Sequence, residues 1–233
     1  MLVLAIDTSS VVATCALWEE GRLVNERVSN SKMTHSQTLM PMIEEMMRES
    51  ELEIESVDYF AVVTGPGSFT GLRIGVATAK ALAHALGKSV VGIPAMEALA
   101  YNLPYVDGII VPIMDARRDR VFTAIYRWEN NKLEIVMDQD VMQIDDLIER
   151  LKSEDIVYFC GDGSIKFRDR FESGIDGKAV FARAYVNMPK ASSVAEVAAD
   201  RIKEGKIQTH LELVPNYLRK SQAEREYDEK HGN

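Results

Sequence analysis

Residues 2–28, LVLAIDTSSVVATCALWEEGRLVNERV, decide the fold class because they contain three short apolar runs joined by turn-forming residues. The runs cover residues 2–6, 12–18 and 23–28, and the turns between them contain Ser9-Ser10 and Gly21-Arg22. Apolar runs of this length between such turns are typical of β-strands. Strands joined this closely pair antiparallel, so we predict an antiparallel meander.

After these strands the pattern changes to alternating helices and strands. We predict, in order, a helix over residues 36–50, a strand over 59–64, a helix over 70–86 and a strand over 89–93. Helices placed between strands imply that those strands pair in parallel. Three strands, then helix, strand, helix and strand, is the order of a ribonuclease-H-like half-domain.

The rest of the chain repeats this theme in a shorter form. Predicted strands cover residues 109–114, 121–128, 133–137 and 156–160, and predicted helices cover 144–151 and 192–204. Two such halves in tandem predict an α/β protein with the actin-like ATPase (ASKHA) architecture, in which the second half is reduced. We expect an N-terminal half at residues 1–104, a C-terminal half at 105–218 and a charged, mobile tail at 219–233.

Composition limits the function classes. The chain has 233 residues with 27 Lys and Arg against 36 Asp and Glu, a formal charge of −9. An acidic protein is a poor free-standing nucleic-acid binder, although a partner could hold the nucleic acid. No apolar run approaches the length of a membrane span, and the start reads as a strand rather than a signal peptide. Cys15 and Cys160 lie in apolar runs, so we expect two buried thiols and a cytoplasmic protein.

The segment 65–75, GPGSFTGLRIG, lies between a predicted strand and a predicted helix, where backbone N–H groups can bind an anion. A P-loop and a dinucleotide fingerprint both require glycine where Thr70 stands, and a P-loop also requires a following lysine. Neither site is therefore supported. The loop glycines Gly65 and Gly67, with Ser68, Phe69 and Thr70, instead favour a tight turn and close packing of the helix that follows.

The two helices on either side of this strand suggest a subunit interface. Small residues recur every four positions in the second helix, at Gly71, Gly75, Ala79 and Ala83, and a neighbouring helix can approach such a face closely. The first helix region contains five of the eleven methionines, and methionine is enriched at interaction surfaces. A methionine-rich core is the alternative interpretation.

Several motifs together resemble the TsaB (YeaZ) family. They are Ile6-Asp7-Thr8-Ser9, Thr34-His35-Ser36, the segment 65–75, Asp115-Ala116-Arg117-Arg118 and the segment 217–224, YLRKSQAE. These matches extend from residue 6 to residue 224, and the segment 65–75 is the most specific of them.

The resemblance implies a bacterial protein needed for N6-threonylcarbamoyladenosine at position 37 of tRNAs that read ANN codons. In that family the chain is a non-catalytic partner that activates or stabilises TsaD, a TsaE-like ATPase joins the complex, and tRNA is contacted only indirectly. The family protein alone forms a homodimer through the same helices. The interface residues expected here are His35, Met42, Met46, Gly71, Arg73, Gly75 and Ala79. His35 near a helix start is also compatible with a cap or packing role.

The residues argue against catalysis by this chain. TsaD-like sequences place two metal-binding histidines four positions apart, where this chain has Ala95 and Leu99, which cannot bind a metal. A zinc-protease HExxH motif and a GxSxG nucleophile motif are both absent, so the sequence predicts no metal site and no glycoprotease activity.

A small actin-superfamily ATPase or kinase acting alone is the main alternative. Asp7, Thr8 and Ser9 follow the first strand, where this superfamily has its first phosphate loop, and Gly161 and Gly163 follow a later strand, where it binds adenosine. Asp115-Ala116-Arg117 replaces a glycine at the second phosphate loop, so we expect a vestigial site with weak ATP or ADP binding at a partner contact. Asp7 could instead cap local N–H groups, and Asp115 to Asp119 could form surface ion pairs. A homodimeric scaffold outside tRNA modification is a third hypothesis.

Overall fold

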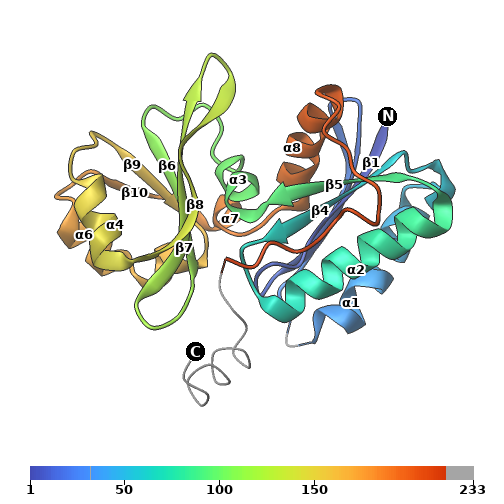
Figure 1. Ribbon diagram of the computed structural model, residues 1–233, viewed down its shortest axis with the longest axis horizontal. Helices are drawn as coiled ribbons and strands as arrows, with labels where there is room; N and C mark the ends of the chain where they lie inside the picture. Colours follow the sequence, from blue (N-terminus) through green and yellow to red (C-terminus); the bar gives the residue numbers. More distant parts are fainter. Residues whose placement is uncertain (32, 219–233) are drawn as a thin grey trace.

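The computed structural model describes residues 1–31 and 33–218. The expectation of a mobile tail at 219–233 lies outside the described residues. Two five-stranded sheets stand side by side, each with helices packed against it (Figure 1). No helix of the described residues is long and apolar enough to cross a membrane.

The first sheet has the strand order β3-β2-β1-β4-β5. Its strands are β1 (Leu2–Asp7), β2 (Ala13–Glu19), β3 (Arg22–Ser29), β4 (Tyr59–Gly65) and β5 (Ser89–Pro94). The first three strands pair antiparallel, and β4 and β5 continue the sheet in parallel with β1. The predicted meander and the predicted parallel pairing are both confirmed.

The second sheet has the order β10-β9-β6-β7-β8. Its strands are β6 (Ile109–Asp115), β7 (Arg120–Glu129), β8 (Lys132–Gln143), β9 (Val157–Cys160) and β10 (Ala179–Phe181). Antiparallel pairing of β6, β7 and β8 and parallel pairing of β6, β9 and β10 reproduce the first sheet strand for strand. This repetition confirms two ribonuclease-H-like halves in the actin-like architecture.

The helices cover both faces of the first sheet. Helices α1 (His35–Glu49) and α2 (Phe69–Leu86) pack on one face, and α8 (Ala191–Lys203) packs on the other (Figure 1). The remaining helices are η1 (Ile54–Ser56), α3 (Ala95–Ala100), α4 (Ile144–Leu151), α5 (Asp162–Lys166), α6 (Arg168–Gly174) and α7 (Ala184–Asn187). Helices α4 and α6 pack against the second sheet, and α3 lies between the two sheets.

Local signals define the ends of α1 and α2. Thr34 is the N-cap of α1, and its backbone N–H donates to Gln37 Oε1 at 3.2 Å, as in a capping box. Ser68 caps α2 by accepting the Gly71 N–H at 3.3 Å, and Gly87 ends it in the left-handed conformation with φ +63°.

The end of the chain returns to the first half. Helix α8 packs on β1 and β2, where the Trp18 indole N–H donates to Glu196 at 2.9 Å. Gln208 then pairs with Val90 of β5. The division at residues 104 and 105 remains a prediction, and the residues from α8 onward contact the first sheet although their sequence position assigns them to the second half.

One hydrophobic cluster joins the two halves. It includes Ala5 and Val91 of the first sheet, Ile110 and Tyr126 of the second, and Val194 of α8. Asn102 lies in the segment 101–108, which connects α3 to β6, and it is 6% exposed. Its amide donates to the carbonyls of Val186 (3.1 Å) and Met188 (2.8 Å), and its Oδ1 accepts the Ser193 hydroxyl at 2.6 Å.

We predict that Asn102→Ala lowers the free energy of unfolding by roughly 2–4 kcal/mol, because two part-buried carbonyls and one buried hydroxyl lose their partner. Urea unfolding of the purified chain measures this loss. As a control, Asn131→Ala alters an exposed turn asparagine and should cost clearly less. An equal effect of both variants would show that the hydrogen bonds of Asn102 do not stabilise the connection between α3 and β6.

Candidate functional site

Asp7, the last residue of β1, and the loop that follows it, residues 8–10, are buried beneath the Gly-rich segment 65–75. Asp7, Thr8 and Ser9 are at most 2% exposed. The Ser9 N–H donates to Asp7 Oδ1 at 2.7 Å, so Asp7 does cap a local N–H group. The Thr8 hydroxyl donates to the Gly71 carbonyl at 2.8 Å, and the Ser68 N–H donates to the Ser9 carbonyl at 2.6 Å. The Asp7 carboxylate and the Thr8 hydroxyl, which would face a phosphate in a related enzyme, are therefore engaged within the chain, whereas the Ser9 hydroxyl is buried without a hydrogen-bond partner among the described residues.

Three glycines allow this close approach. A Cβ on Gly67 would overlap the carbonyl of Ser9, one on Gly71 would overlap the carbonyl of Thr8, and one on Gly75 would overlap the Thr8 hydroxyl. Gly65, with φ +129°, similarly leaves room for the carbonyl of Asn216. The interpretation of these glycines as a device for close packing is confirmed.

The structure corrects the predicted orientation of α2. Its small residues Gly71, Gly75, Ala79 and Ala83 are buried against the loop after β1 and the first sheet, not on an outer face. A four-residue spacing of small side chains suits packing on a sheet as well as packing on a helix, so the sequence left the partner of this face undetermined. Gly71, Gly75 and Ala79 are therefore internal packing residues.

The methionines of α1 also divide between two environments. Met46 is 0% exposed and belongs to the core, which corrects its expected place at an interface, whereas Met42 is half-buried. Met40 is 46% exposed and Met33 is 57% exposed. On α2, the exposed side chains include Arg73, Ala77 and Ala81. The exposed residues of these two helices are thus mixed in character, and of the expected interface residues Arg73 is one of them, whereas Met40, Ala77 and Ala81 were not predicted.

Arg73 is held in a fixed position at the rim of this face. Its guanidinium carbon lies 4.0 Å from the centre of the Phe69 ring, and its Nε–H donates to the Tyr217 hydroxyl at 3.1 Å. Phe69 and Tyr217 also contact each other, with ring centres 4.7 Å apart. Phe69 of the Gly-rich loop thus anchors the C-terminal segment, while Thr70 is exposed.

Burial controls the charge of Asp7. Desolvation raises the pKa of this carboxyl to about 6, and the hydrogen bonds from Ser9 and the charge of His35 oppose that effect. His35 Nε2 lies 2.8 Å from the Ser10 carbonyl, to which it can only donate. His35 therefore ties the start of α1 to the loop, in agreement with the packing interpretation.

The equivalent loops of the second half are also packed. Gly161, with φ +93°, donates its N–H to the Asn187 carbonyl at 2.8 Å, and a Cβ on Gly161 or Gly163 would overlap Ile113. Asp115 pairs with Lys166 at 2.6 Å, as expected of a surface ion pair. Asp162 lies between Gly161 and Gly163 and was not among the predicted site residues. Burial raises the pKa of its carboxyl. Nucleotide binding at Gly161 and Gly163 remains a prediction.

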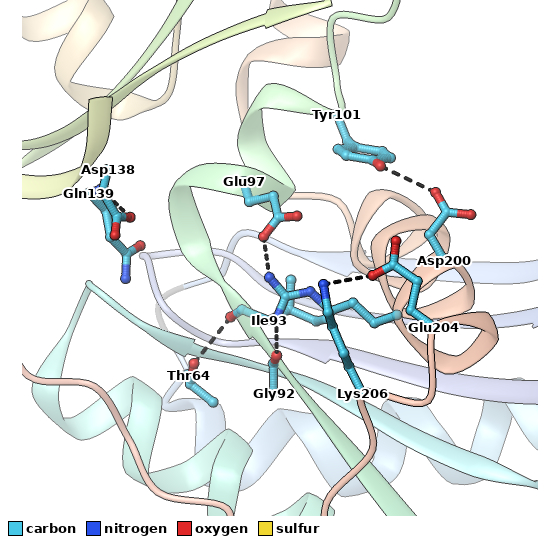
Figure 2. A network of polar contacts seen from close by, with 11 residues as sticks. Thr64, Gly92, Ile93, Glu97, Tyr101, Asp138, Gln139, Asp200, Glu204 and Lys206 are labelled. Atoms are coloured by element: carbon cyan, nitrogen blue, oxygen red, sulfur yellow. Dashed lines mark hydrogen bonds and ion pairs between the residues drawn. The ribbon is translucent and has the colours of Figure 1, made fainter. Parts of the chain in front are cut away.

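A polar network not foreseen from the sequence connects α3, α8 and β5 (Figure 2). Glu97 of α3 forms an ion pair with Arg201 of α8, whose Nη1 also donates to the Gly92 carbonyl of β5 at 3.0 Å. Burial raises the pKa of Glu97, and Arg201 partly offsets this. Nearby, the Tyr101 hydroxyl donates to Asp200 at 3.3 Å. Each of these groups is paired, so the network stabilises the packing of α3 against α8 and β5.

The two positions that correspond by resemblance to the metal-binding histidines of TsaD-like sequences are also structural. Ala95 and Leu99 lie in α3 and are at most 1% exposed. In the described part of the chain, no group of three or more His, Cys, Asp or Glu side chains could hold a metal ion. Burial raises the pKa of both cysteine thiols to about 12, so neither is activated as a nucleophile.

We predict that Gly71→Ala lowers the free energy of unfolding by roughly 2 kcal/mol or more, even though alanine favours helices by about 1 kcal/mol over glycine. The added Cβ meets the backbone of Thr8, which cannot move aside as a flexible side chain could. Ala81→Ser, at an exposed position of the same helix, is the control and should change stability little. Denaturant unfolding compares the two, and a neutral Gly71→Ala would contradict the packing argument.

Asp7→Asn should alter the pH dependence of stability. Because folding raises the pKa of Asp7 from about 4 to about 6, its protonated form stabilises the fold below pH 4, and this contribution is lost as the pH rises through 6. Asparagine keeps the Oδ1 acceptor without the buried charge. We expect Asp7→Asn to be more stable than the native chain by about 2–3 kcal/mol at pH 8, with little difference at pH 4. Urea unfolding across this range measures it, and an equal or lower stability at pH 8 would contradict it.

Comparisons with known proteins agree with this geometry. The family model described as TsaD, tRNA N6-adenosine threonylcarbamoyltransferase, matches residues 23–227. The tRNA threonylcarbamoyladenosine biosynthesis protein TsaB of Bacillus subtilis is 35% identical over 98% of this chain and 99% of its own length. The protein of the same name in Escherichia coli is 27% identical over 96% of both. The structure of YeaZ from Pseudomonas aeruginosa superposes with a TM-score of 0.79 at 23% identity, covering 93% of this chain and 99% of that one.

The identity to a full-length relative and the near-complete coverage show the family, and the solved structure shows the same fold. The chain therefore belongs to the TsaB (YeaZ) family of proteins of tRNA threonylcarbamoyladenosine biosynthesis.

Proposed function

We propose that this chain is a non-catalytic partner subunit in the synthesis of N6-threonylcarbamoyladenosine at position 37 of tRNAs reading ANN codons. It activates or stabilises a TsaD-like catalytic subunit. The observation that carries this proposal is the packed loop after β1: Asp7, Thr8 and Ser9 are buried, and the Asp7 carboxylate and the Thr8 hydroxyl are bonded within the chain, where an actin-like enzyme would present them to a phosphate.

The partner would dock on the outer face of the first half. We define the α1–α2 surface as Met40, Pro41 and Glu44 of α1 with Arg73, Ala77 and Ala81 of α2, all of which are exposed. The two helices contact each other, so a partner that lies across both would cover these exposed residues. Small side chains on α2 allow a partner helix to approach closely, and Met40 adapts to irregular shapes. The same surface would form a homodimer when the chain is alone.

Other components follow from the family and the charge. A TsaE-like ATPase would join the complex, and the formal charge of −9 suits a subunit that leaves tRNA to its partners. The chain would act in the cytoplasm. Weak ATP or ADP binding would require a partner contact, because Asp7, Thr8 and Ser9 are buried in the chain alone. An ATPase acting alone would need a rearrangement that opens the buried loop.

The first test introduces bulk and charge into the α1–α2 surface. We expect Ala77→Arg combined with Ala81→Arg to weaken association with a TsaD-like subunit at least tenfold and to lower threonylcarbamoyl transfer in parallel. Both side chains are exposed, so the fold should be unchanged. Analytical ultracentrifugation measures association, and a reconstituted transfer assay measures activity.

Ala184→Arg, an exposed alanine in α7 of the second half, is the matched control and should leave both measurements unchanged. Native association of the double variant would show that the partner uses another surface. Equal transfer in the absence of the chain would contradict the subunit role itself, and ATP turnover by the isolated chain would then favour the enzyme alternative.

A further inference from the structure

Residues 207–217 form a strap along the first half, which we call the C-terminal strap. Gln208 and Val90 of β5 exchange two backbone hydrogen bonds of 2.9 Å. Leu213 is 1% exposed in the core, and its carbonyl accepts the Lys80 ammonium of α2 at 2.8 Å. The Asn216 N–H donates to the Thr64 carbonyl at 2.7 Å. The strap is thus fixed to β4, β5 and α2 on both sides of residues 209–212.

Two histidines meet where the strap passes the end of α2. His84 lies in the last turn of α2, and His210 lies between the Gln208 and Leu213 anchors. Their ring centres are 4.5 Å apart, and the ring planes are tilted by 49°. The turn that carries His210 is closed by N–H bonds from Glu212 (3.2 Å) and Leu213 (3.3 Å) to the Thr209 carbonyl. Each imidazole is therefore attached to a fixed element.

This separation suits shared coordination of a metal ion. A metal bound about 2.1 Å from an imidazole nitrogen lies about 3 Å from the centre of that ring. Two imidazoles in cis positions on one ion then have ring centres roughly 4.5–5 Å apart. The observed 4.5 Å falls at the lower end of that range.

We propose that His84 and His210 together bind one divalent transition-metal ion of the imidazole-preferring class, such as Ni²⁺, Cu²⁺ or Zn²⁺. Mg²⁺ and Ca²⁺ prefer oxygen ligands and are excluded by the donor type. Glu212 is engaged with the Thr209 N–H (2.8 Å) and hydroxyl (2.9 Å), so water completes the coordination. The bound ion cross-links the strap to α2.

Ni²⁺ is the probe for the first test, on the untagged full chain by isothermal titration calorimetry. We expect one ion per chain and at least a tenfold loss of affinity in both His84→Ala and His210→Ala. His231→Ala is the control and should bind as the native chain does. Equal binding by the native chain and the His84→Ala/His210→Ala double variant would overturn the proposal, as would loss of binding in His231→Ala alone.

A second measurement reports on the cross-link itself. Ni²⁺ should slow amide hydrogen exchange in residues 208–216 of the native chain and raise its unfolding temperature, with neither effect in His84→Ala. His84 is exposed, so this variant should fold normally. Unchanged strap exchange at saturating Ni²⁺ would show that the ion does not join the two elements.

Discussion

The contact between Thr8 and the glycines of α2 is the constraint on which the first half depends. Gly71 and Gly75 let the start of the helix rest directly on the loop after β1, and the Thr8 hydroxyl bonds to the Gly71 carbonyl. This packing buries Asp7, and it turns the side of α2 that carries the small residues towards the first sheet. It also places Phe69 where it can hold Arg73 and Tyr217.

The packing of α2 on the loop after β1 also bears on function. An actin-like enzyme needs an open loop after its first strand, and here that loop supports a helix. The second half repeats the arrangement, because Gly161 and Gly163 pack on Ile113. The exposed residues on the outer side of α1 and α2 are the ones proposed here for recognition. The family membership places the chain in tRNA threonylcarbamoyladenosine biosynthesis, and the buried loop after β1 is the basis of its proposed role as a partner there.

Local sequence patterns predicted much of the fold and less of the site. The strand order, α1, α2 and the close packing of the glycines follow from periodicity and turn residues. The inward direction of Ala79 and the burial of Met46 depend on contacts between distant segments, which a four-residue spacing does not specify. The return of α8 and the strap to the first sheet is equally non-local. The Glu97–Arg201 ion pair connects residues more than one hundred positions apart, so no local sequence motif predicts it.

Hydrogen exchange with and without a TsaD-like catalytic subunit tests the central claim most directly. The account predicts slower exchange in residues 38–48 and 70–85 when the subunit is added, and unchanged exchange in residues 2–10, which are already buried. Slower exchange elsewhere with no change in α1 and α2, or exposure of the loop after β1 on binding, would contradict it.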